Sequence, residues 1–169
     1  MQRFVRQFVV IGSAFSLALL GGCGGPDHPP PPALWVEGLP VSGSLQDAHK
    51  AGFTTCFDFT VEMRCRRNDV MFHGFGPFNA AVDLNGGNGG GGFDQLTLWH
   101  DWDQNALLPI LSALERQGWR ACFTGEGNHG DQGIYSHPKV SVRLSLDLSY
   151  WGKRRLRVMP PWNHRESRC

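Results

Sequence analysis

The chain has 169 residues, of which 41% are hydrophobic, and its formal net charge is +1 at pH 7. This length fits one domain of ordinary size with a real hydrophobic core and excludes an array of several domains. No segment beyond residue 22 is apolar enough to span a bilayer, which requires roughly 20 consecutive apolar residues.

The first 22 residues have the pattern of a secretory signal peptide. Residues 1–7 carry two arginines and no acid, residues 8–20 are almost purely apolar or small, and two glycines precede Cys23. A basic start, a short apolar run and a small-residue exit are typical of such a peptide. A buried helix, the alternative, fits the one-sided arginines and the glycines badly. We therefore predict that residues 1–22 are removed on export.

Residues 20–23 read Leu-Gly-Gly-Cys. They resemble the lipobox of bacterial lipoproteins, and the resemblance covers only residues 1–25. It implies that Cys23 receives a diacylglyceryl group on its sulfur and that its new amine is acylated after cleavage. Gly24, standing where an Asp often marks inner-membrane retention, implies an outer-membrane anchor facing the periplasm. The alternative is ordinary signal cleavage nearby, with Cys23 left as a free thiol.

A glycine- and proline-rich stretch at residues 23–33 follows the lipobox. Proline favours the extended polyproline II form, which rises about 3.1 Å per residue. We expect this stretch to be a tether that holds a domain at 34–162 away from the membrane, with a C-terminal tail at 163–169. A docking ligand for a proline-reading partner is the alternative for a run of this kind.

The first half of the domain reads as one helix and several strands. Ser44 is a good N-cap for a helix at 45–51, and Gly52 can end it in the left-handed conformation. The glycine-rich residues 86–92 lack the Lys-Ser/Thr ending of a phosphate-binding loop, so we expect a flexible connection there. Strands are expected at about 53–58, 62–67, 69–75, 78–84 and 93–100.

The second helix has one clear apolar face. Its positions are spaced i, i+3, i+4 and i+7, and they are Leu107, Ile110, Leu111 and Leu114. Asp103 is the expected N-cap, with Pro109 in the first turn or at the true start. Gly118 is expected just past the last turn, with Trp119 packing over Leu114.

The second half of the domain continues with strands at about 120–124, 132–136, 140–150 and 153–159. Residues 140–150 alternate perfectly between apolar and polar side chains, which predicts a strand with one face in the core and the other in solvent. A weak repeat at an offset of 66 aligns Gly52-Phe53 with Gly118-Trp119, although shared helix-ending chemistry or chance would also produce it. We predict an α+β fold, an antiparallel sheet with two helices packed on one face and possibly two helix-plus-hairpin repeats.

Five cysteines stand in the chain, and four remain beside Cys23. An exported chain permits disulfides among them, and sequence alone leaves three full pairings open. We prefer Cys56 with Cys65, facing each other across a hairpin that turns near Thr60-Val61, which leaves Cys122 and Cys169. No pair has metal-finger spacing, so we expect no metal, and nothing in the sequence calls for a cofactor.

Two polar segments are weak candidates for catalysis. Residues 99–103 place His100 and Asp101 before the second helix, and a polar loop at 125–131 holds His129 between acids. One histidine with carboxylates is chemistry for an acid or base. We favour a structural interpretation of both: an acid caps the helix and the tryptophans pack in the first segment, and the second is a turn.

The charges are unevenly distributed along the chain. Residues 23–149 hold 8 basic and 14 acidic residues, whereas residues 150–169 hold 6 basic residues and 1 acidic residue. Lys153, Arg155 and Arg157 would share one strand face and could meet lipid headgroups, acidic polysaccharide or an acidic partner. A charged edge strand that resists aggregation is the equal alternative. We do not expect nucleic-acid binding by an exported chain without interleaved stacking aromatics.

These patterns together favour a non-enzymatic, lipid-anchored envelope protein. It would bind another envelope component, a protein or a polymer, and attach to the membrane through its N-terminal lipid. One alternative is an envelope hydrolase using His100, Asp101 or His129. Another is a periplasmic inhibitor or immunity protein that inserts a loop such as 86–92 or 125–131 into a target enzyme.

Overall fold

The computed structural model describes residues 28–125, 130–148 and 154–162. In chain order their elements are β1 (Leu34–Val36), β2 (Leu39–Ser42), α1 (Leu45–Lys50), β3 (Thr55–Asp58), β4 (Glu62–Phe72), β5 (Phe75–Asn85), β6 (Leu96–Trp99), α2 (Leu108–Arg116), β7 (Arg120–Phe123), β8 (Gln132–Ser136), β9 (Arg143–Asp147) and β10 (Leu156–Met159).

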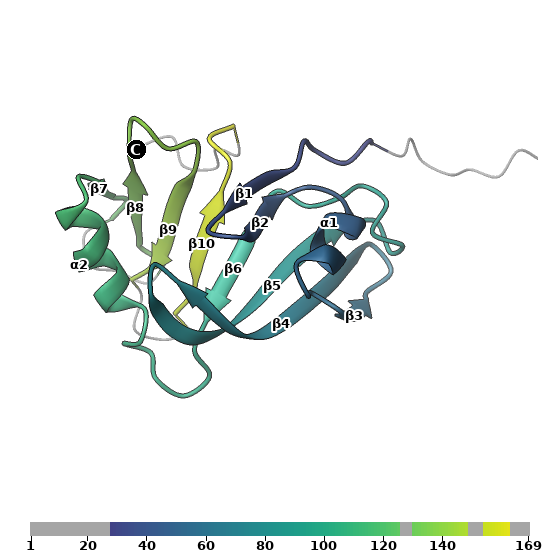
Figure 1. Cartoon of the computed structure of the whole chain (residues 1–169), viewed down its shortest axis with the longest axis horizontal. Helices are drawn as coiled ribbons and strands as arrows, with labels where there is room; N and C mark the ends of the chain where they lie inside the picture. The colour runs from purple at the N-terminus through teal and green to yellow at the C-terminus, as the bar shows by residue number, and fades with distance from the viewer. Residues whose placement is uncertain (1–27, 126–129, 149–153, 163–169) are drawn as a thin grey trace, which may run out of the picture.

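The fold is largely β, and the predicted antiparallel sheet is confirmed (Figure 1). Eight strands pair in the order β3-β4-β5-β6-β10-β9-β8-β7, and β1 and β2 form a separate two-stranded sheet. The order is symmetric about the β6–β10 pair, since each half of the sheet is a run of four sequential strands preceded by a helix. Of the described helices, none is long and apolar enough to cross a membrane.

Helix α1 begins as the sequence predicts. The Ser44 hydroxyl accepts a hydrogen bond from the backbone N–H of Asp47 (3.3 Å), and the Asp47 carboxylate accepts one from the backbone N–H of Ser44 (3.0 Å). This reciprocal capping box satisfies two N–H groups that a helix start leaves free. Gly52 follows the helix with φ +82°, the left-handed conformation expected for it.

One predicted strand break is wrong. The predicted strands at 62–67 and 69–75 form a single strand, β4, whose register shifts between Arg67 and Val70. Asp69 occupies the left-handed region there, with φ +56°, so the residues that suggested a boundary form a bulge. The chain turns instead at His73-Gly74, where both residues have positive φ.

The β1–β2 hairpin is absent from the sequence prediction. It turns at Glu37-Gly38, with φ values of 51° and 76°, which is the conformation that tight hairpins favour. The end of the predicted tether lies against it, since the Ser42 hydroxyl donates to the Pro32 carbonyl at 2.7 Å.

The glycine-rich connection at 86–92 is closely packed where the sequence suggested flexibility. A Cβ on Gly92 would lie 2.4 Å from the carbonyl oxygen of Gly43 and 2.5 Å from Pro30. The next residue, Phe93, exchanges two backbone hydrogen bonds with Gly43, both 2.9 Å. Glycine is therefore required here for close backbone approach.

Helix α2 starts later than predicted. Its first residue is Leu108, with Pro109 in the first turn, and the expected N-cap Asp103 instead accepts a hydrogen bond from the backbone of Asn105 at 2.8 Å. The predicted end is confirmed: Gly118 has φ +89°, and the backbone N–H of Trp119 donates to the Leu114 carbonyl at 3.1 Å.

Strand β9 is shorter than the alternating segment 140–150, whose last two residues lie outside the described part. Leu144 and Leu146 are fully buried as predicted, but Ser145 between them is only 5% exposed. The expected solvent position is covered because the Ser145 hydroxyl donates to Gln132 at 2.8 Å beneath the side chain of Arg157. Strand β10 likewise begins at Leu156, with Lys153 outside the described residues.

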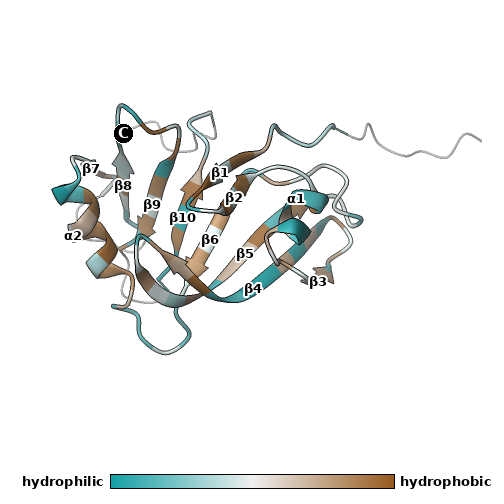
Figure 2. Cartoon of the chain, viewed as in Figure 1, coloured by the Kyte–Doolittle hydropathy of each residue, from teal (hydrophilic) through white to brown (hydrophobic). Residues whose placement is uncertain are grey.

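The hydrophobic core lies on one face of the sheet. Residues opposite one another in register share a face, and one such row runs from Cys65 across the sheet through Val82, Leu96, Val158 and Leu144, all buried. Buried residues of both helices join the same cluster, among them Ala48, Ile110 and Leu114. Figure 2 shows that the two long strands differ in hydropathy: β4 has a hydrophilic stretch, and the neighbouring β5 is more hydrophobic.

Candidate functional site

The opposite face of the sheet is polar and hollowed. One row on it, read in register from β4 to β10, is Arg66, Ala81, Thr97 and Arg157. Two short side chains therefore lie between two long ones, and this difference in length makes the hollow, which measures about 290 Å³.

Charged and amide side chains dominate the lining of the hollow. Its cations are Arg64, Arg66, Arg155 and Arg157, and its carboxylates are Asp83 and Asp101. The other side chains around it are Asn68, Asn79, Ala81, Gln95, Thr97 and Trp99. The structure thus brings Arg155 and Arg157, predicted to meet an anionic surface, beside two arginines of β4 that the prediction omitted.

Two of the four arginines are neutralised by ion pairs. Arg64 donates from Nη2 to Asp83 at 3.0 Å and also from Nε, and the hydrogen bond to Asp83 raises the pKa of Arg64. Arg157 donates to both oxygens of Asp147, at 2.6 and 3.2 Å. Such two-point pairing fixes the orientation of the guanidinium.

The other two arginines have no carboxylate in contact among the described residues. The guanidinium of Arg66 lies over the ring of Phe57, 5.4 Å from its centroid, and 5.8 Å from that of Trp99. These are cation–π distances. Arg155 is exposed at the edge of the hollow. Arg66 and Arg155 thus lack an ion-pair partner among the described residues, and with the Asp101 carboxylate counted the lining stays net positive.

The predicted catalytic pair His100 and Asp101 stabilises a loop. Asp101 accepts hydrogen bonds from Asn79 at 2.7 Å and from the indole of Trp99 at 3.0 Å. His100 Nδ1 accepts from the backbone N–H of Asp103 at 2.8 Å and of Trp102 at 3.3 Å. The prediction that an acid of this segment caps the helix is wrong, and so is the packing of Trp102, which is 91% exposed. His129 lies outside the described residues.

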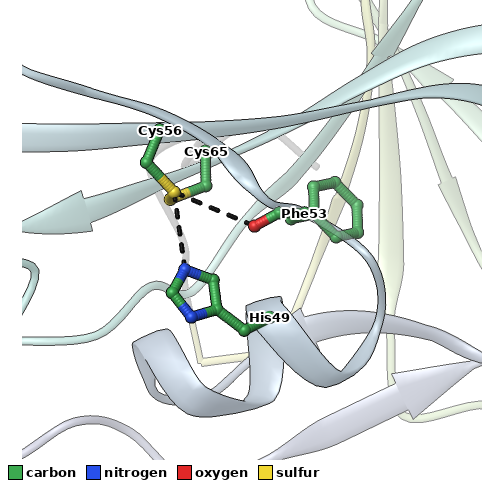
Figure 3. Close-up of a disulfide and its surroundings, with 4 residues drawn as sticks. All are labelled: His49, Phe53, Cys56 and Cys65. Atoms are coloured by element: carbon green, nitrogen blue, oxygen red, sulfur yellow. Dashed lines mark hydrogen bonds between the residues drawn. A yellow bond between two sulfur atoms is a disulfide. The ribbon is translucent and has the colours of Figure 1, made fainter.

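The predicted disulfide between Cys56 and Cys65 is confirmed (Figure 3). His49 of α1 points at it, with Nε2 3.6 Å from the Cys56 sulfur. These three residues place their ligand atoms within 4.8 Å of one another. A metal would need thiolates, however, and both sulfurs are bonded to each other.

Of the two other cysteines predicted to form a disulfide, Cys122 and Cys169, only Cys122 lies among the described residues. Cys122 is also disulfide-bonded, and Cys169, the partner that the sequence leaves for it, lies outside the described residues, as does Cys23. In register Cys122 lies opposite Ile134 and shares the row of Ser145 and Arg157. Cys122 thus faces the polar side, unlike its offset-66 counterpart Cys56, which pairs with buried Cys65 on the core side.

Residues 62–67 carried information that the sequence analysis missed. Arg64 and Arg66 are two positions apart in a strand, so they lie on the same face. The pattern Glu-Met-Arg-Cys-Arg-Arg alternates basic residues with Met63 and Cys65, which is the sign of one polar face. The sequence does not predict the strand order, which places β4 and β10 in the same sheet with only β5 and β6 between them.

Comparisons with protein-family models, with curated proteins and with solved structures found no match for this chain.

Proposed function

We propose that this protein is a lipid-anchored component of the bacterial envelope that binds another envelope component through the polar face of its sheet. The observation that carries the proposal is the pair of arginines without an ion-pair partner, Arg66 and Arg155, in a hollow on that face whose lining is net positive. Charge left unpaired on a folded surface is available to a partner of opposite sign.

The proposal takes the two helices as packed on the core face, which leaves the polar face for binding. Support comes from the single buried cluster that Ala48 of α1 shares with Ile110 and Leu114 of α2. With the helices on one side, the other side of the sheet carries the hollow, whose lining comes from β4 and β5 and from residues in and beside β6 and β10.

We also take the sheet as built from the two helix-plus-hairpin repeats that the sequence suggests, each continued by two further strands. The ends of α1 and α2 support this, since equivalent hydrogen bonds recur at an offset of 66: Phe53 donates to Ala48, and Trp119 donates to Leu114. The symmetric strand order supports it as well. In this arrangement Arg66 comes from the first repeat and Arg155 from the second, so the hollow lies across their junction.

The anchor is proposed from the N-terminal sequence. Leu-Gly-Gly-Cys at residues 20–23 resembles a lipobox and so supports lipidation of Cys23. The two or more acyl chains added there would hold the protein stably on a membrane, which a single chain does not. Mass spectrometry of the mature N-terminus should show an acylated Cys23. A chain that starts at an unmodified residue would contradict this part of the proposal.

Catalysis has less support than binding. The acceptor nitrogen of His100 and both oxygens of Asp101 are engaged in holding their own loop. A general base needs a free acceptor aimed at a substrate proton. The protruding loop of an inhibitor also lacks support at 86–92, where Gly92 is packed against Gly43 and Pro30.

Site-specific photo-crosslinking in cells tests the proposal. A photoreactive residue at Asn68, which is exposed and lines the hollow, should give one defined adduct with an envelope component. The same residue at Ser112, exposed on α2, is the control and should give none. Adducts from Ser112 alone, or from neither position, would overturn the docking face.

A further inference from the structure

We infer that the hollow receives carboxylate side chains from an acidic segment of a partner protein, held between Arg66 and Arg155. This inference rests on the proposed function and adds the chemistry of the partner to it.

The charge of the hollow calls for an anion. Arg64 and Arg157 are each bound to an aspartate, so a visiting group meets the two charges of Arg66 and Arg155 against the single carboxylate of Asp101, a net positive field. A guanidinium offers a planar fork of N–H donors that matches the two oxygens of a carboxylate. Both arginines are exposed, so an incoming carboxylate reaches them without displacing a buried group.

Arg66 is held in position before any ligand arrives. Phe57 and Trp99 contact its guanidinium, and both rings belong to strands of the same sheet, β3 and β6. Holding a long side chain in one orientation in advance reduces the entropy lost on binding. Neither ring accepts a conventional hydrogen bond, so the N–H donors of the guanidinium remain available to a carboxylate.

The surroundings favour a protein over a small molecule. Small-molecule pockets are lined mainly by apolar side chains and enclose most of their ligand, whereas charged and amide groups line this hollow. Two exposed aromatic residues accompany it: Phe57, whose ring lies against the Arg66 guanidinium, is 45% exposed, and Trp102, which follows the lining residue Asp101 in sequence, is 91% exposed. Tryptophan and arginine are the residues that most often dominate protein–protein binding energy.

The loop that carries Trp102 is itself braced. Asp101 and His100, on its N-terminal side, accept four hydrogen bonds from Asn79, Trp99 and the loop backbone. An exposed tryptophan on a braced loop presents apolar surface at low entropic cost. A partner would therefore place acidic residues in the hollow and an apolar patch on Trp102.

Calorimetric titration of the full-length protein in detergent tests the chemistry. The probes are poly-L-glutamate and polygalacturonate of matched chain length and charge, which separate an acidic protein segment from an acidic polysaccharide. We expect tighter binding of polyglutamate. Arg66→Gln and Arg155→Gln should each weaken it about three- to tenfold, in line with exposed charge-assisted contacts. Arg116→Gln, at an exposed position of α2 outside the hollow, should leave it unchanged.

Three results would overturn the inference: equal or tighter binding of polygalacturonate, no binding of polyglutamate, or equal losses from Arg116→Gln and the hollow variants. Arg66→Lys adds a further readout, because it retains the charge but loses the planar fork, and we expect a loss close to that of Arg66→Gln. If polyglutamate fails while Asn68 still crosslinks a partner in cells, the carboxylate chemistry is wrong and the docking face stands.

Discussion

Asp83 sets the charge that the hollow offers to a partner. Its carboxylate holds Arg64 through two hydrogen bonds, with about a third of each side chain exposed. An exposed pair of this kind contributes only about 0–1 kcal/mol to stability. Its larger effect is on binding, since it removes one of four arginines from the field that a ligand meets.

Replacing Asp83 should therefore tighten the binding of an acidic probe. In Asp83→Asn, Arg64 is freed, and we expect the affinity for polyglutamate to rise several-fold with a steeper dependence on salt. Asp69→Asn is the control, because this exposed residue of β4 does not line the hollow and asparagine accepts its φ of +56°. Calorimetry in which Asp83→Asn binds no better than Asp69→Asn would contradict the role of the hollow's charge.

Trp102 separates binding from stability at a single residue. Because its side chain is 91% exposed, Trp102→Ala should change the free energy of unfolding by less than about 0.5 kcal/mol. We expect the yield of the Asn68 crosslink in cells to fall markedly. Urea unfolding and crosslink yield measure the two effects, and an unchanged yield would remove Trp102 from the interface.

The pairing of Cys56 with Cys65 was predictable because both lie in one hairpin, where the turn sets the register. The hollow was not, because Arg66 and Arg157 are far apart in sequence. Their approach depends on β10 pairing with β6, a long-range choice that local patterns do not encode. The alternation of residues in β4 indicates that Arg64 and Arg66 share a polar face, but it does not indicate which other strands contribute side chains to that face.

At the scale of the element, the capping box of α1 should make stability depend on acid pH. Hydrogen bonds from Ser44 lower the pKa of Asp47 in the folded protein. A carboxyl group with a lowered folded pKa stabilises the fold above its unfolded pKa of about 3.9, and this contribution is lost as the pH falls through the folded value. Asp47→Asn should therefore destabilise the protein at neutral pH and much less at low pH.

Urea unfolding at both pH values measures this difference. Ser44→Ala should cost about 1 kcal/mol at neutral pH, the usual value of an N-cap. Its effect should shrink on acidification along with that of Asp47→Asn, since the two side chains act together. A cost for Asp47→Asn that stays constant with pH would show that the capping box does not contribute through its charge.

The Cys56–Cys65 disulfide closes a short loop between β3 and β4, since the sequence separation of the two cysteines is 9. Restricting a loop of this size in the unfolded chain stabilises a protein by about 2–3 kcal/mol. Cys56→Ala with Cys65→Ala should lose about that amount in chemical unfolding. A loss below about 0.5 kcal/mol would mean that the bridge adds little to the β3–β4 pair.

Element boundaries were predictable where one residue decides them, as Gly52 and Gly118 do at the two helix ends. Boundaries were not predictable where the same residues fit two different backbone structures. Asn68-Asp69 suits a turn as well as a bulge, and only the pairing of β4 with β5 chooses between them. The β1–β2 hairpin was missed because its strands are very short.

At the scale of the whole molecule, the two faces of one sheet have divided roles. One buried cluster joins residues of β4, β5, β6, β8, β9 and β10 with buried residues of β2, α1 and α2. The polar face has a row with short side chains at Ala81 and Thr97, so long arginines surround a hollow instead of filling it. This division follows from period-two alternation along each strand combined with one register across the sheet.

Binding through the polar face can be tested in the envelope itself. The test measures how much of the partner that crosslinks at Asn68 is recovered in pull-downs from detergent-solubilised envelope, with the charge-reversed proteins as bait. We predict that Arg66→Glu with Arg155→Glu loses this partner. The matched reversal Arg116→Glu with Lys139→Glu, at two exposed positions outside the hollow, should retain it. Equal recovery of the partner by both reversed proteins would contradict the account.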